Sequence, residues 1–237
     1  MAKHKRGKNR KVKGNCHSRH PFPGQLVVVG GQSRKVGKTA LMVDLIKAFP
    51  KYRWTAIKIT PHADSGCPVK GAKCTCGPGA HTFAIHWEKI RKGKTDTSRF
   101  LAAGAEKSVW LQTKSGKLTD ALPSLISEIG DVENVIVESN SILRLWKPDL
   151  FLLVLDPANP DFKNSARKVW RLADAFVFRS PPEICANPNE EQIPKSGRPN
   201  FLQPLGAALP GKVQKFVRQH FRLIDHHKAR QQERIFS

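Results

Sequence analysis

The chain has 237 residues, of which 39% are hydrophobic and 25% are charged, and its formal net charge is +22. This composition is somewhat polar for a globular protein but is not that of a wholly disordered chain. No hydrophobic run in the sequence is long enough to cross a bilayer, which excludes a transmembrane segment. No hydrophobic segment follows the basic N-terminus at once, so we expect no secretory signal. Five Cys residues without a secretory context argue against a disulfide framework. We therefore expect a basic, cytoplasmic protein with reduced thiols.

Residues 1–22 are predicted to form a basic, disordered arm. The first twenty residues carry eight Lys and Arg and no Asp or Glu. Hydrophobic side chains are too few there to order the segment by burial. Clustered Lys and Arg release counterions from phosphates, so the arm can make non-specific contacts with nucleic acid, or it can act as a solvated tail.

From residue 25 onwards, strand-like and helix-like segments alternate. Continuous β-branched runs indicate buried strands, and hydrophobic residues at helical spacing indicate amphipathic helices. The expected strands are 25–30, 54–59, 108–112, 134–138, 150–155 and 175–178, and the expected helices are 39–49, 98–105, 118–129 and 164–172. This alternation predicts an α/β fold of three layers, with helices on both faces of a mostly parallel sheet.

We predict that this α/β domain spans residues 23–180. Residues 60–95 lack periodicity and form a Cys/His-rich insertion. Residues 181–237 form a C-terminal extension, which begins as an irregular Pro-rich stretch and continues as a basic amphipathic helix. The predicted hydrophobic face of that helix carries Val213, Phe216, Val217, Phe221 and Ile224.

The loop between the first strand and the first helix is predicted to bind phosphate. A Gly-rich turn followed by Gly-Lys-Thr and a helix offers backbone N–H groups and the positive end of the helix to an anion. Lys38 would reach the outer phosphates, and the Thr39 hydroxyl would bind Mg²⁺. Five residues separate Gly31 from Gly37, one more than the strict pattern has. The predicted binding residues of the loop are Gly31, Gln32, Ser33, Arg34, Lys35, Val36, Gly37, Lys38, Thr39 and Ala40.

Two carboxylates are expected to complete the site. Glu138 and Asp156 each follow a strand-like run, where a parallel sheet delivers functional side chains. We favour Glu138, because the polar residues Ser139-Asn140-Ser141 follow it. Asp96 is a candidate N-cap of the helix at 98–105 and also a candidate ligand. We therefore expect Glu138 and Asp96 to act in catalysis and, with Thr39, to bind Mg²⁺.

The segments "VVVGG…GKT", "AIKIT", "DTSRFLAAGA" and "VIVES" occur in this order. Their order resembles the MobB family of molybdopterin-guanine dinucleotide biosynthesis proteins, over about residues 25–180. The resemblance implies a P-loop GTP-binding protein with slow hydrolysis, whose partner is the molybdopterin nucleotidyltransferase that attaches GMP. It also implies that Lys58 belongs to the site, together with Asp96 and Glu138. The sequence has no Asn-Lys-x-Asp motif that would select guanine, so GTP and ATP both remain open.

The insertion holds Cys67, Cys74 and Cys76, with His62, His81 and His86 nearby. Thiolate and imidazole ligands could form a Zn²⁺ site, although Cys-x-Cys is not the spacing that makes such a site a strong prediction. The alternative is a thiol-bearing lid over the nucleotide.

Three other functions compete with the MobB-like interpretation. A small-molecule kinase would use the same phosphate loop. A metal-delivery GTPase would use the Cys and His ligands, and an RNA-associated protein would use the basic ends.

Overall fold

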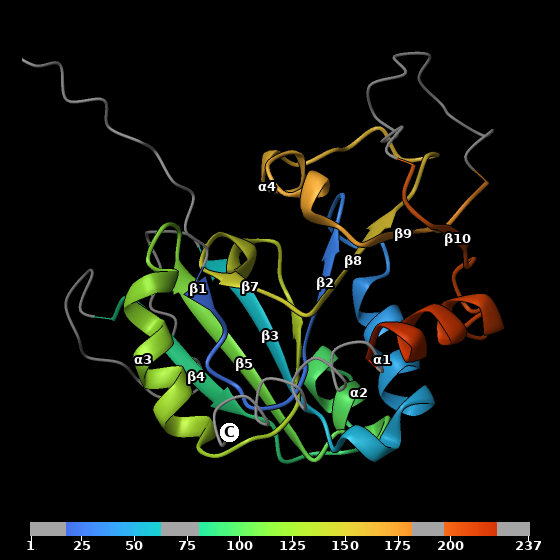
Figure 1. Ribbon diagram of the computed structural model, residues 1–237. Helices are drawn as coiled ribbons and strands as arrows, with labels where there is room; N and C mark the ends of the chain where they lie inside the picture. Colours follow the sequence, from blue (N-terminus) through green and yellow to red (C-terminus); the bar gives the residue numbers. More distant parts are fainter. Residues whose placement is uncertain (1–17, 63–80, 182–196, 222–237) are drawn as a thin grey trace, which may run out of the picture.

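The computed structural model describes residues 18–62, 81–181 and 197–221, which fold around one eight-stranded sheet (Figure 1). The strand order is β10-β9-β8-β2-β6-β3-β5-β4. Strand β4 pairs antiparallel with β5, whereas the other neighbouring strands of this sheet are parallel. The bounds are β2 Leu26–Gly31, β3 Thr55–His62, β4 Phe83–Trp87, β5 Lys107–Lys114, β6 Val135–Glu138, β8 Leu150–Leu155, β9 Ala175–Phe178 and β10 Asn200–Leu202.

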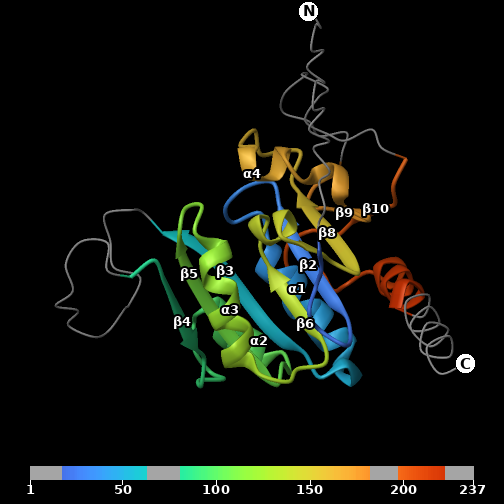
Figure 2. The same ribbon diagram turned by 60° about the vertical axis from the view of Figure 1, so that its left-hand side comes forward.

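Helices cover both faces of this sheet (Figures 1 and 2). On one face, α1 (Lys38–Ala48), α2 (Asp96–Ala102) and the helical residues 211–221 share a hydrophobic core with the strands. On the other face, α3 (Leu118–Ile129) and the 3-10 turn η2 (Ser141–Arg144) pack in a second core. The predicted three-layer α/β fold is therefore confirmed.

The central strands are buried along their whole length, because helices cover both of their faces. Every residue of β2 and β8 is buried, as their continuous hydrophobic runs indicate. Helix α1 instead buries one stripe, which consists of Leu41, Met42, Leu45 and Ile46. The predicted bounds of β8, β9 and α3 are confirmed, and those of α1, β2 and β6 are right to within one residue.

Two strands of the large sheet were not predicted from the sequence. Strand β4 lies at one edge of the sheet and buries only Ala84, so its pattern is weak within a Gly-rich segment. Strand β10 lies at the other edge and has three partly or fully exposed residues. Both strands escaped prediction for the same reason. An edge strand needs fewer buried side chains than a central strand, so its hydrophobic pattern is weaker.

Two further local expectations were wrong. The helix predicted over 164–172 is split into α4 (Asn164–Arg167) and the 3-10 turn η3 (Trp170–Leu172), with a bond from the Val169 N–H to the Ala166 carbonyl. Asp96 is not an N-cap but the first residue of α2. The N-cap is Thr95, whose hydroxyl accepts a hydrogen bond from the Ser98 N–H.

The packed part of the chain begins before residue 23, where we expected the basic arm to end. Strand β1 (Ser18–Arg19) pairs in parallel with β7 (Trp146–Lys147) in a separate two-stranded sheet. His20 and Phe22 are buried, and Phe22 packs edge-to-face on Trp146 at 5.3 Å between ring centroids. His20 also bonds through Nε2 to the Asp149 carboxylate at 2.7 Å. Residues 1–17 lie outside the described part of the chain.

The polypeptide segments that the structure describes contain no helix with the length and hydrophobicity needed to span a membrane.

Candidate nucleotide-binding site

The Gly-rich loop connects β2 to α1 and is closed by its own lysine. The ammonium group of Lys38 donates a hydrogen bond to the Ser33 carbonyl at 2.9 Å. Gly37 has a φ of 94°, which favours glycine, and Lys35 has a φ of 60°. A Cβ at Gly31 would lie 2.7 Å from side-chain carbons of both Lys38 and Val36. The loop can therefore wrap this tightly only because glycine occupies position 31.

The side-chain amides of Asn140 and Gln32 hold the Gly-rich loop in place. The side chain of Asn140 accepts a hydrogen bond from the Gly31 N–H and donates one to the Gly31 carbonyl, both at 2.9 Å. The Gln32 side chain accepts from the Asp156 N–H at 2.9 Å and donates to the Asn159 carbonyl at 2.6 Å. Because both amides act as donor and acceptor at once, they fix the loop backbone without placing a charge beside it.

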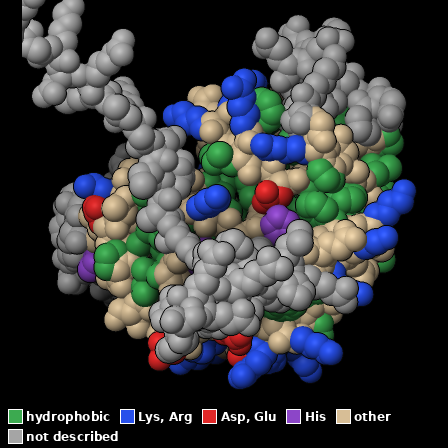
Figure 3. Space-filling view, in the orientation of Figure 1, with side chains coloured by type: hydrophobic (Ala, Val, Ile, Leu, Met, Phe, Trp, Pro, Cys, Tyr) green, Lys and Arg blue, Asp and Glu red, His purple; other side chains and the backbone are tan. Residues whose placement is uncertain are grey.

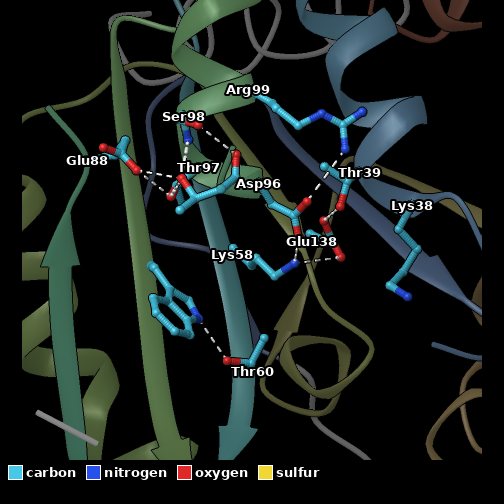
Figure 4. A network of polar contacts seen from close by, with 12 residues as sticks. Lys38, Thr39, Lys58, Thr60, Glu88, Asp96, Thr97, Ser98, Arg99 and Glu138 are labelled. Atoms are coloured by element: carbon cyan, nitrogen blue, oxygen red, sulfur yellow. Dashed lines mark hydrogen bonds and ion pairs between the residues drawn. The ribbon is translucent and has the colours of Figure 1, made fainter. Parts of the chain in front are cut away.

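A hydroxyl and two carboxylates meet beside the loop (Figure 4). Thr39 donates its hydroxyl hydrogen to Glu138 Oε2 at 2.6 Å. The Lys58 ammonium group lies between the two acids: it pairs with Asp96 Oδ2 and lies 3.6 Å from Glu138 Oε1. Arg99, one helical turn after Asp96, approaches Asp96 Oδ1 to 3.6 Å. Four elements (α1, β6, β3 and α2) therefore converge on one polar network.

The helix that carries Asp96 is held in turn by Glu88. This carboxylate accepts hydrogen bonds from the Thr95 and Thr97 hydroxyls at 2.7 and 2.9 Å. It also accepts from the backbone N–H groups of Lys89 and Ile90. Partial burial acts to raise the pKa of Glu88, but these four hydrogen bonds together outweigh it and hold the pKa below its usual value. Glu88 thus fixes the start of α2 and, through it, the position of Asp96.

The loop and the network enclose a cavity of about 680 Å³. Among the described residues that line it, the acidic ones are Asp96 and Glu138, and the basic ones are Arg34, Lys35, Lys38, Lys58, Arg99 and Lys163. Burial lowers the pKa of Lys38, and Glu138 partly opposes this effect. Burial, and then the nearby Arg34, also lower the pKa of Lys163. Because burial makes these two cations costly to keep charged, an anionic ligand in the cavity would stabilise them.

Most of the residues predicted for the site line this cavity. They are Gly31, Ser33, Arg34, Lys35, Gly37, Lys38, Thr39, Ala40, Lys58, Asp96 and Glu138. Gln32 and Val36 are buried and are not part of the lining, so their side chains shape the loop from within. Asp156, the alternative to Glu138, is not part of the lining either, and it accepts hydrogen bonds from Ser180 and the Ala158 N–H.

Several residues of the site were not predicted from the sequence, and Lys163, Leu205 and Arg179 are the ones that matter most for the Gly-rich loop. Lys163 and Leu205 line the cavity. Arg179 is buried beneath the loop and donates to the Gly37 carbonyl at 2.7 Å and to the Gln203 carbonyl at 2.9 Å. Arg179 directly follows β9, so the rule that placed Glu138 at the carboxyl end of its strand could also have indicated Arg179.

We expect Arg179→Met to destabilise the protein, because both carbonyls would lose a donor where water has little access. The free energy of unfolding should fall by about 2 kcal/mol, measured by urea denaturation. Burial lowers the pKa of Arg179, so part of this cost is offset by removing a buried charge. Arg144→Met, at an exposed position, is the matched control and should leave the unfolding midpoint unchanged. Equal midpoints for the two variants would contradict a structural role for Arg179.

The predicted Zn²⁺ ligands Cys67, Cys74 and Cys76 lie outside the described residues, as do the other two cysteines and the side chain of His62. Within the described ranges, no cluster of three or more His, Cys, Asp or Glu side chains could hold a metal ion. His86 lies on β4, with its ring 5.5 Å from that of Trp110, and His81 is exposed.

No protein-family model matches the sequence, and no curated protein matches it. Three solved structures resemble the fold at low similarity. LpxK from Aquifex aeolicus in complex with ATP is 19% identical at a TM-score of 0.44, over 78% of this chain and 55% of that one. HypB from Helicobacter pylori in complex with nickel is 13% identical at a TM-score of 0.43, over 88% of this chain and 89% of the HypB chain. MobB from Bacillus subtilis is 14% identical at a TM-score of 0.34, over 83% of this chain and 97% of the MobB chain.

This chain therefore spans just over half the length of the LpxK chain. At these identities and TM-scores, the assignment of the fold rests on the sheet and on the Gly-rich loop described above, and not on these three proteins.

Proposed function

We propose that the protein binds a nucleoside triphosphate together with Mg²⁺ in this cavity and hydrolyses it slowly. The observation that carries the proposal is the meeting of two features in one cation-rich cavity. The Gly-rich loop presents Lys38 at the start of α1, and the Thr39 hydroxyl bonds directly to a buried carboxylate, Glu138. A phosphate loop needs such a neighbouring acid to place the metal ion beside the phosphates.

The phosphates would lie over the loop between Gly31 and Thr39. The first backbone N–H groups of an α-helix have no acceptor within the helix, so those of α1 can bind an anion there, and the helix adds its positive end. Lys38 would exchange its bond with the Ser33 carbonyl for a bond with a phosphate oxygen, which raises its pKa again. Arg34 and Lys163 supply further positive charge from the cavity wall.

Thr39, Asp96 and Glu138 fit Mg²⁺ by their chemistry, because a hydroxyl and carboxylates are oxygen ligands of the kind that this ion prefers. The ion would neutralise charge on the phosphates during hydrolysis. Lys58 holds Asp96 and Glu138 together from the cavity side. Its ammonium group offsets the repulsion between these two carboxylates.

Titration of the purified protein with ATP and with GTP, each with and without Mg²⁺, tests this proposal. We expect saturable, Mg²⁺-dependent binding and the slow release of inorganic phosphate. Base preference is an outcome of the same experiment. A protein that binds neither nucleotide would refute the proposal.

A small-molecule kinase is the second candidate, and the extent of the cavity favours it. Beyond Glu138 the lining continues to Thr60, Ser141 and the half-exposed Arg99. These groups could hold an anionic phosphoryl acceptor next to Asp96, a candidate general base. Radiolabelled phosphate that moves from the nucleotide to a metabolite, rather than to water, would establish this function.

The resemblance of the motifs to the MobB family supports a narrower form of the first proposal. In that form the protein is a GTP-binding accessory protein of molybdenum cofactor biosynthesis, and its partner is a molybdopterin nucleotidyltransferase.

The positive charge of the surface suggests another partner, nucleic acid. Lys and Arg side chains gather over the α4 region and along the lower edge of the face in Figure 3. Nucleic acid would bind such a surface without sequence specificity and with a steep dependence on salt.

A further inference from the structure

Leu205 is an exposed hydrophobic side chain on the wall of a cavity that is otherwise lined largely by polar and charged groups. It is 60% exposed, and it follows β10 in the extension beyond the region with MobB-like motifs. Its Cδ2 atom lies 2.8 Å from the place that a Cβ on Gly37 would occupy. Leu205 therefore lies directly against the Gly-rich loop, immediately before Lys38.

The turn that carries Leu205 is fixed to the nucleotide site by hydrogen bonds from two buried side chains. Gln203 is fully buried, and its side chain donates to the Asp44 carboxylate of α1 at 2.7 Å. Arg179 connects the Gln203 carbonyl to the Gly37 carbonyl. The Ala207 N–H closes the turn on the Pro204 carbonyl at 3.1 Å. These bonds tie the position of Leu205 to the loop and the start of α1, so its exposure does not come from a loosely attached segment.

The strand order places different elements on the two sides of the Gly-rich loop, so the two ends of the cavity carry different side chains. Strand β2 lies between β6 and β8, and the strands are parallel, so their carboxyl ends reach the same edge of the sheet. Glu138 and Lys58 reach the cavity from β6 and β3 on one side of the loop. Leu205 reaches it from beyond β10, on the other side.

A nucleotide with its terminal phosphates and Mg²⁺ at the Glu138 end must therefore extend its nucleoside away from the carboxylates. We propose that Leu205 packs against the nucleoside of the bound triphosphate. The proposal rests on the nucleotide-binding function proposed above. A leucine side chain offers hydrophobic contact to the face of a base and no hydrogen bond to its edge. The contact therefore favours a nucleoside triphosphate over a bare polyphosphate, and it favours adenine and guanine alike.

The test compares ATP and GTP with inorganic tripolyphosphate, each in the presence of Mg²⁺, by titration calorimetry. Leu205→Ala should weaken the binding of both nucleotides by about tenfold, because it removes most of one hydrophobic contact. The affinity for tripolyphosphate should stay within about twofold of the parent value. Leu205→Met keeps the hydrophobic contact and should bind all three ligands like the parent protein. Leu202→Ala is the matched control, since Leu202 is an exposed leucine of β10 that does not line the cavity.

Unchanged nucleotide affinity in Leu205→Ala would overturn the inference. An equal loss for tripolyphosphate would overturn it too, because Leu205 would then act on the shape of the loop rather than on the nucleoside. Both results leave the phosphate site intact, so they differ from a failure of the proposed function. A parent protein that binds none of the three ligands would refute the phosphate site and, with it, this inference.

Discussion

Lys38→Ala should weaken the binding of a nucleoside triphosphate by roughly 100-fold, since charge-assisted hydrogen bonds to phosphate are among the strongest in the site. Lys38 lines the cavity at the start of α1, and its ammonium group donates a hydrogen bond to the Ser33 carbonyl of its own loop. Burial lowers the pKa of the Lys38 ammonium group, which means that its charged form is destabilised. A bound anion would stabilise that charged form. Titration of the variant with Mg²⁺ and ATP or GTP measures the loss.

The fold should survive this substitution, because Lys38 adds little to either hydrophobic core. The free energy of unfolding should change by less than about 1 kcal/mol, as judged from urea denaturation. Lys47→Ala is the matched control: it removes one positive charge from the exposed last turn of the same helix and should bind nucleotide normally. Parent-like nucleotide affinity in a folded Lys38→Ala protein would rule out the phosphate-binding interpretation of the loop.

The centre of the fold could be read from the sequence because local pattern and burial agree there. The run Leu150 to Leu155 is wholly hydrophobic, and β8 is wholly buried between two helical layers. The spacing within Leu118 to Ile129 matches the buried stripe of α3. Strand β10 offered no such signal, because its three residues are held by pairing with β9 more than by their own burial.

The candidate site was only partly predictable, for a related reason. Lys38, Thr39 and Glu138 follow rules that tie a residue type to a place in the chain, namely a Gly-rich turn or the end of a strand. The amide of Asn140 bonds to Gly31 across 109 positions, and Gln203 bonds to Asp44 across 159. Such pairs have no local pattern, because they exist only once the sheet has brought their elements together. Leu205 was missed for the same reason.

Glu138→Gln should slow nucleotide hydrolysis far more than it weakens nucleotide binding. Glutamine has nearly the same shape, and its amide oxygen can still accept the hydrogen bond from Thr39. It removes the negative charge that Lys58 faces and that would act on Mg²⁺ and the attacking water. Most ground-state affinity would come from the loop N–H groups and Lys38, which the substitution leaves in place. We expect the turnover rate to fall roughly 100-fold and the dissociation constant to change by less than about fivefold.

A matched carboxylate separates this specific effect from a general loss of negative charge near the loop. Asp156 directly follows β8, accepts a hydrogen bond from the Ser180 hydroxyl and does not line the cavity. Asp156→Asn should therefore keep turnover within about threefold of the parent, because the group lies outside the space where charge develops. If Glu138→Gln lowers affinity and turnover by the same factor, Glu138 serves ground-state binding alone. The acid that acts on the reaction would then be Asp96, which shares the Lys58 ammonium group with Glu138 and faces the same cavity.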